Sequence, residues 1–161
     1  MENKEITSTR GQLIALTALR VLIGWHLLYE GIVKVLNPDW SAAGFLRDSG
    51  WILSGFFHWI AATPGVLRVV DALNACGLTL IGAGLMLGLF TRASMLAGIV
   101  LILFYYLAAP PLTGLYYNFP AEGNYLIVNK TLLEAASLAV LLCFPAAARI
   151  GLDRLFFRGR K

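Results

Sequence analysis

The stretch "RVLIGWHLLYEGIVK", residues 20–34, decides the fold, because it is apolar enough for a membrane helix and yet carries four ionisable side chains. These are Arg20, His26, Glu30 and Lys34. At ~100° per residue, the four side chains fall within roughly a 120° arc of one helix. His26, Glu30 and Lys34 are spaced four apart, so that neighbours can touch. An unpaired charge at bilayer depth costs at least ~2.5–3.5 kcal/mol. We therefore expect this polar stripe to face other helices rather than lipid.

The composition of the whole chain agrees with a membrane protein. The 161 residues are 58% hydrophobic and 14% charged, and the mean hydropathy is +0.73. Soluble domains have ~25% charged and ~45–50% apolar residues. The length fits a single domain, residues 1–161. Basic residues gather in "RIGLDRLFFRGRK" near the end and are too few elsewhere for a nucleic-acid-binding face, so this segment is better explained as a cytoplasmic flank.

Four segments reach the ~20 apolar residues that a membrane-spanning helix needs. They lie at about 11–35, 66–89, 92–109 and 123–144. The middle two are separated by the short stretch "GLFTR", and short connections favour antiparallel neighbours. The sequence thus predicts an all-α fold, an integral membrane four-helix bundle with up-down topology.

The first connection and the basic residues predict how this bundle sits in the membrane. Residues 40–63 are aromatic and interrupted by glycines, which is typical of one or two interfacial helices. The opposite end of the bundle carries most of the basic residues, namely Lys4, Arg10, Arg92, Arg149, Arg154, Arg158, Arg160 and Lys161. The positive-inside rule therefore predicts that both termini are cytoplasmic and that residues 40–63 face outward.

Other predicted helices offer charged partners to the polar stripe. The second segment carries Asp71 and Asn74 near its start, and the fourth carries Lys130 and Glu134, four residues apart. Three positive and three negative side chains balance, namely Arg20, Lys34 and Lys130 against Glu30, Asp71 and Glu134. This balance predicts one shared network, in which His26 is the member that can titrate near neutral pH.

The motifs that are missing narrow the chemistry. The sequence contains no CxxC, GxGxxG, P-loop, CxxCH or GxSxG motif, and His58 in the outer segment is the second of two histidines. We therefore expect no metal, haem or nucleotide site. A redox protein of this kind needs a lipid-soluble partner such as a quinone, which requires hydrogen-bond donors and protons. We assign catalytic roles to His26, Glu30 and Glu134. The candidate cofactor-binding residues are Arg20, Lys34, Asp71, Asn74, Asn129 and Lys130.

Several stretches resemble one known family. They are "LRVLIGWHLLYEGIVKVLNPDW", "GLMLGLFTRASMLAG", "EGNYLIVNKTLLEAASLAVLLCFP" and "GLDRL", in this order. Together they resemble DoxX family membrane proteins, most closely the DoxD-like branch, the small subunit of thiosulfate:quinone oxidoreductase. The resemblance covers nearly the whole chain past residue 12. It implies a four-helix bundle in the bacterial or archaeal cytoplasmic (inner) membrane, a partner subunit in a larger redox assembly, and a role in passing electrons to quinone.

Two other functions stay open. The chain could be a non-enzymatic scaffold or accessory subunit of a larger complex, in which the charge network fixes only the helix register. Gly24 and Gly31, spaced seven apart beside the polar stripe, favour close helix packing in either case. A small-molecule or lipid transporter is the third possibility, although the inverted repeats and broken helices typical of transporters are not evident. A homo-oligomer is compatible with all three.

Overall fold

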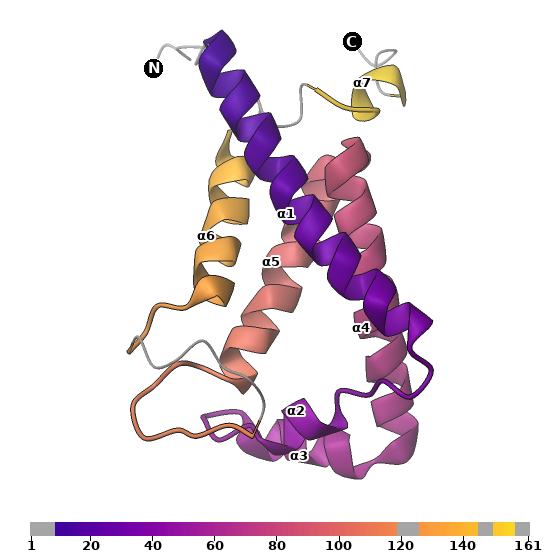
Figure 1. The fold of residues 1–161 in the computed structure, drawn as a ribbon, viewed down its shortest axis with the longest axis vertical. Helices are drawn as coiled ribbons and strands as arrows, with labels where there is room; N and C mark the ends of the chain where they lie inside the picture. Colours follow the sequence, from indigo (N-terminus) through magenta and orange to yellow (C-terminus); the bar gives the residue numbers. More distant parts are fainter. Residues whose placement is uncertain (1–8, 119–125, 145–149, 157–161) are drawn as a thin grey trace, which may run out of the picture.

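The computed structural model describes residues 9–118, 126–144 and 150–156, and over these ranges the chain is helical and contains no strand (Figure 1). In chain order the helices are α1 (Arg10–Leu36), α2 (Ala43–Arg47), α3 (Ser54–Ala62), α4 (Pro64–Leu87), α5 (Thr91–Ala108), α6 (Lys130–Cys143) and α7 (Asp153–Phe156).

Helices α1, α4 and α5 are long and apolar enough to cross a membrane, with 27, 24 and 18 residues. Their bounds agree with the predicted segments to within two residues. Three such helices indicate a multi-pass membrane protein in a lipid bilayer. The predicted interfacial segment 40–63 also forms helices, since it contains α2 and α3.

Helix α6 is shorter than predicted. The sequence predicted that this helix starts at about residue 123. The prediction is wrong for residues 126–129, which precede the helix, and residues 123–125 lie outside the described ranges. Leu126 has a positive φ of 65°, which a helix cannot include. Asn129 then adopts an extended backbone, and its side chain accepts a hydrogen bond from Leu132 N at 2.9 Å. This is an N-cap, so α6 begins at Lys130 and has 14 residues.

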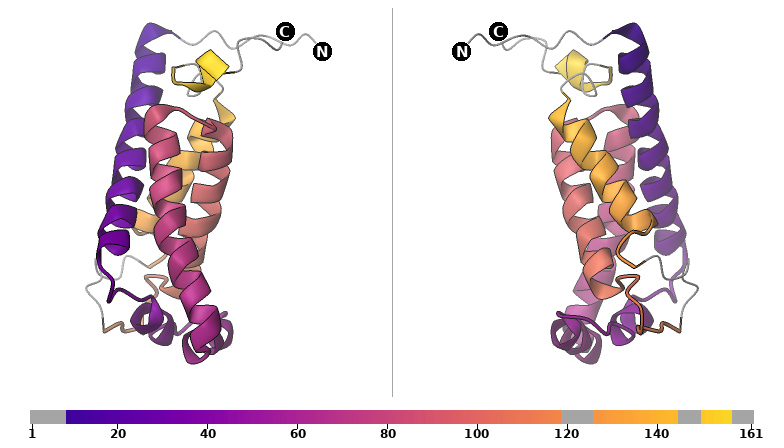
Figure 2. Two further views of the ribbon diagram at one scale, coloured as in Figure 1. Left: turned by 90° about the vertical axis from the view of Figure 1, so that its right-hand side faces the viewer. Right: turned by 90° about the vertical axis from the view of Figure 1, so that its left-hand side faces the viewer.

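Two hydrophobic cores hold the helices together. The larger one lies between α1, α4, α5 and α6, where Leu78, Leu85, Met95 and Leu138 are almost completely buried. The smaller one joins α2 and α3 to the adjoining ends of α4 and α5, and is formed by Ala42, Leu46, Phe57, Ile60, Ala61 and Ala108. Figures 1 and 2 show α2 and α3 lying across one end of the long helices, with α7 at the opposite end.

Glycines bring the backbones of α1 and α4 into direct contact. A Cβ atom at Gly24 would meet the α4 backbone at 2.9 Å, and one at Gly31 would overlap Thr79. From the other side, a Cβ atom at Gly82 would overlap the backbone of Leu28. The prediction that Gly24 and Gly31 allow another helix to approach closely is therefore confirmed, and α4 is that helix.

Candidate functional site

The polar stripe of α1 meets α6 through one close pair. His26 Nδ1 lies 2.8 Å from Glu134 Oε1. Because a carboxylate accepts hydrogen bonds, the Nδ1 atom donates, and the pair joins two helices that are 108 residues apart in sequence. The His26 side chain is 38% exposed and that of Glu134 is 12% exposed. The predicted link between the charges of the first and last apolar segments is present here.

Three more charged side chains surround this pair. Lys34 Nζ donates to Glu30 Oε2 at 2.7 Å, one helical turn apart. Lys34 also lies over the Trp40 ring, 5.4 Å from its centroid. Glu30 and Lys130 are close enough to His26 for their charges to act on it. We call His26, Glu30, Lys34, Lys130 and Glu134 the outer cluster; its formal charges cancel when His26 is neutral.

Asp71 and Asn129 have other partners than those the sequence predicted. Asp71 accepts hydrogen bonds from Ser41 Oγ at 2.8 Å and from Ala42 N at 2.9 Å. It thereby fixes the start of α2 to α4, which replaces its expected place in the charge network. Asn129 caps α6 through Leu132 N. Short polar side chains favour such caps because they satisfy free backbone amides at helix starts.

Arg20 belongs to a second polar group, at the opposite end of the long helices. Arg20 belongs to α1, and its side chain is buried. Its guanidinium group lies close to Gly88, where a Cβ atom would be 3.1 Å from the guanidinium nitrogens. The charge of Asp153 acts on Arg20. The single predicted network is thus divided between the outer cluster, the Asp71 cap and this second group around Arg20.

Asp153 holds the turn between α4 and α5. Its carboxylate accepts from Phe90 N at 2.7 Å and from Thr91 N at 2.9 Å, while its own amide donates to Gly88 O at 2.8 Å. Partial burial raises the pKa of Asp153, but the hydrogen bonds from Thr91 and Phe90 and the charge of Arg20 outweigh this and hold it below its usual range. The carboxylate caps α5, whose preceding residue Phe90 has a left-handed backbone.

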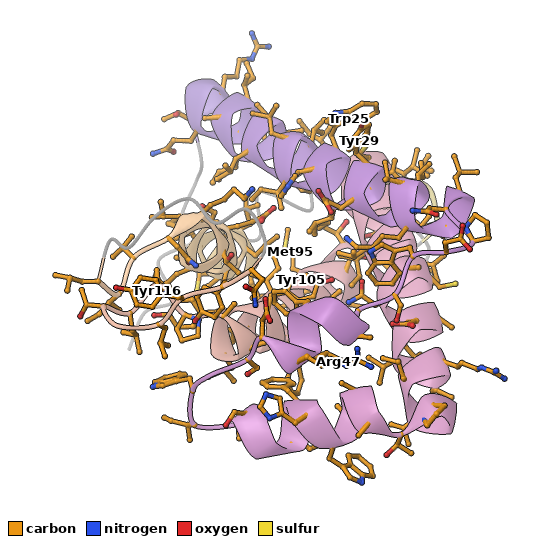
Figure 3. The ribbon with its side chains drawn as sticks, turned by 60° about the horizontal axis from the view of Figure 1, so that its bottom comes forward. Trp25, Tyr29, Arg47, Met95, Tyr105 and Tyr116 are labelled. Carbon is orange, nitrogen blue, oxygen red and sulfur yellow. The ribbon has the colours of Figure 1, made fainter. Side chains whose placement is uncertain are left out.

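An apolar cavity of about 300 Å³ lies between α4 and α5 beneath α2 and α3. We call it the α4–α5 cavity. Two polar side chains line it, since Tyr105 Oη donates to Asn74 Oδ1 at 2.9 Å. The Phe45 ring of α2 meets the edge of the Tyr105 ring, with centroids 6.0 Å apart. Figure 3 shows Tyr105 inside the molecule near α2, whereas Trp25 and Tyr29 lie on the outer side of α1.

The charge pattern did not predict Tyr105, because the third segment carries no charge after Arg92. The sequence signal was "LFYYLA", which contains two hydroxyl groups within an apolar run. A tyrosine combines a large apolar ring with a polar tip that needs a partner when it is buried. Asn74, which was predicted to bind a cofactor, supplies that partner.

Within residues 9–118, 126–144 and 150–156, no three side chains of the metal-binding types lie close enough together to hold an ion. No protein-family model, curated protein or solved structure matches this chain.

Proposed function

We propose that this chain is the membrane subunit of a quinone-linked oxidoreductase of the DoxX type, close to the DoxD-like branch. The observation that carries the proposal is the outer cluster, because five ionisable side chains gather among apolar helices and include a cross-helix histidine–carboxylate pair. Ionisable residues at such positions are costly and are typically functional.

The residues present fit a quinone. A bound quinone would take up two electrons and two protons in becoming a quinol. Its carbonyl oxygens need hydrogen-bond donors, and its ring needs apolar walls. Lys130 and Asn74 carry N–H donors, and His26 can donate from Nε2 when its ring is protonated. Asn74 and Tyr105 line an apolar cavity, where the Tyr105 hydroxyl hydrogen is used by Asn74 Oδ1. Glu30 is 49% exposed, which leaves a path for protons to reach the cluster from outside.

Within the cluster, His26 is the residue best suited to move a proton. Glu134 fixes the imidazole by accepting from Nδ1, and within the described residues no hydrogen-bond partner lies at Nε2. In the neutral ring, Nε2 can therefore take up a proton while Glu134 stabilises the charged form. Glu30 can exchange protons with solvent at the exposed edge, and Lys34 balances its charge.

The proposal extends to the membrane and the partner. We infer that α6 spans the bilayer together with α1, α4 and α5, in the cytoplasmic membrane and with both termini in the cytoplasm. The turn at Arg92 then faces the cytoplasm, and α2 and α3 lie at the outer surface. Because the sequence carries no motif for an electron carrier, electrons come from a partner subunit with its own redox group.

Purification in mild detergent tests this function directly. Mass spectrometry of the extract should find close to one quinone per chain and a co-purifying redox protein. Glu134→Gln should lower quinone reduction by the purified assembly at least tenfold, because the histidine loses its charged partner. A partner without quinone would favour the scaffold function instead. Glu134→Gln with unchanged activity and thermal stability would contradict any role for the cluster.

A further inference from the structure

The α4–α5 cavity is open toward the surroundings of the long helices. Three side chains on its wall are large, apolar and exposed, namely Phe56 of α3, Leu73 of α4 and Phe104 of α5. Two of them belong to helices long enough to cross a membrane. A molecule dissolved in the hydrocarbon region can therefore reach the cavity sideways, without passing through water.

The inner part of the cavity has a polar end. Asn74 is more than nine-tenths buried, and its Oδ1 accepts the Tyr105 hydroxyl hydrogen. This bond uses the acceptor side of the amide. Within the described residues no acceptor lies at Asn74 Nδ2, so its hydrogens can bind a ligand. Asn74 lines the cavity, and a carbonyl oxygen there would give this donor an acceptor.

We propose that the α4–α5 cavity binds the carbonyl-bearing ring of a membrane quinone, with Asn74 as the donor to one carbonyl and the chain leaving past Leu73. The assignment deepens the proposed function and rests on it. A volume of about 300 Å³ is at the small end of ligand sites, which suits a ring and the first part of its chain.

The cavity also contains a side chain that is within reach of a charge of the outer cluster. Glu30 is close enough to Tyr105 for its charge to act on the hydroxyl group. Tyr105 therefore bonds to the amide that lines the cavity and is within electrostatic reach of Glu30. Asn74 is in this scheme a ligand-binding residue, and Tyr105 is a positioning residue that holds its amide.

Photolabelling of the purified full chain tests the assignment. The probe is an azido-substituted decylbenzoquinone, the competitors are decylbenzoquinone and decylbenzene, and peptide mass spectrometry locates the label. We expect label within 64–74 or 101–108. Leu73→Trp should narrow the entrance and weaken binding roughly tenfold. Leu80→Trp is the matched control, because Leu80 lies two turns further along the same face and is 72% exposed, against 67% for Leu73.

The polar end is tested by Asn74→Leu. This variant should weaken competition by decylbenzoquinone roughly tenfold, about the effect of one buried hydrogen bond, and leave competition by decylbenzene unchanged. Equal competition by both compounds in the natural chain would identify a site for lipid chains and overturn the assignment. Label near His26 would overturn the cavity site while the quinone function stands. A chain that binds no quinone anywhere would contradict the function and the site together.

Discussion

Helix α1 has two contrasting sides. Toward α4, glycines let the two backbones touch, and Gly24, Gly31 and Gly82 leave no room for a side chain. Toward α6, the packing is much less extensive, and the pair His26–Glu134 joins the helices. We call these the glycine seam and the polar seam. The glycine seam thus joins α1 to α4 by direct backbone contact, whereas the polar seam joins α1 to α6 through a pair of ionisable side chains.

Breaking the glycine seam should have the largest effect. In Gly82→Leu the new side chain would overlap the backbone of Leu28, which cannot move as a side chain can. Overpacking typically costs ~1–3 kcal/mol, and the collision with backbone should bring the loss above ~3 kcal/mol. We expect a thermal midpoint at least 10 °C lower or aggregation on size-exclusion chromatography.

Gly77→Leu is the control for this substitution. Gly77 lies on the same helix, and a Cβ atom there has nothing within 4 Å. Leucine also has a better helix propensity than glycine by up to ~1 kcal/mol, so this variant should keep or gain stability. Equal destabilisation of the two variants would show that the seam does not depend on close approach.

The polar seam should contribute less to stability and more to function. A double-mutant cycle with His26→Ala and Glu134→Ala should give a coupling energy of about 1.5–3 kcal/mol, the usual range for a hydrogen bond with a charged partner. Thermal unfolding in one detergent measures it. A coupling near zero would mean that the two side chains do not stabilise each other, and that α6 is held by its apolar contacts.

Asp153→Asn tests the second polar group, in which Arg20 of α1 is buried and feels the charge of this carboxylate. Loss of the charged cap on α5 should cost about 1 kcal/mol at pH 7. The pKa of Asp153 is held below its usual value of ~3.9. The contribution of the Asp153 carboxylate to the stability of the fold is therefore complete at pH values above this usual pKa. It is lost as the pH falls through the lowered pKa of the folded protein. The thermal midpoints of the two proteins should converge at the acidic end of a pH series, and a constant difference down to pH 2 would contradict this.

The smallest effect should come from Lys34→Met. The Glu30–Lys34 bond joins neighbouring turns of one helix, and Glu30 is half exposed. Such pairs contribute about 0.3–0.5 kcal/mol. We expect a shift of the thermal midpoint below 2 °C in this variant. A larger shift would indicate that Lys34 also holds the Trp40 segment through its ring contact.

Hydropathy alone predicted the three long helices, because each is a continuous apolar run. The four-residue spacing likewise predicted the contact between Glu30 and Lys34 within α1. The balance of charges predicted a network shared between helices, but it did not specify the pair His26–Glu134. The caps could not be predicted in this way. Asp71 binds a turn 29 residues earlier in sequence, and such partners depend on where the loop folds back. The α4–α5 cavity escaped prediction because its polar residues, Asn74 and Tyr105, carry no charge and lie in an apolar context.

The hydrogen bonds of Asp153 also place a condition on synthesis. The amide of Thr91 finds its carboxylate partner 62 residues later in the chain. At ~5–20 residues per second, a ribosome needs roughly 3–12 s to make that stretch. At the start of this interval α4 is complete, and α5 is made within it. Until Asp153 is made, the start of α5 lacks its cap and Phe90 lacks the bond that supports its left-handed backbone. The turn between α4 and α5 therefore acquires its hydrogen bonds to Asp153 only after α6 has been made.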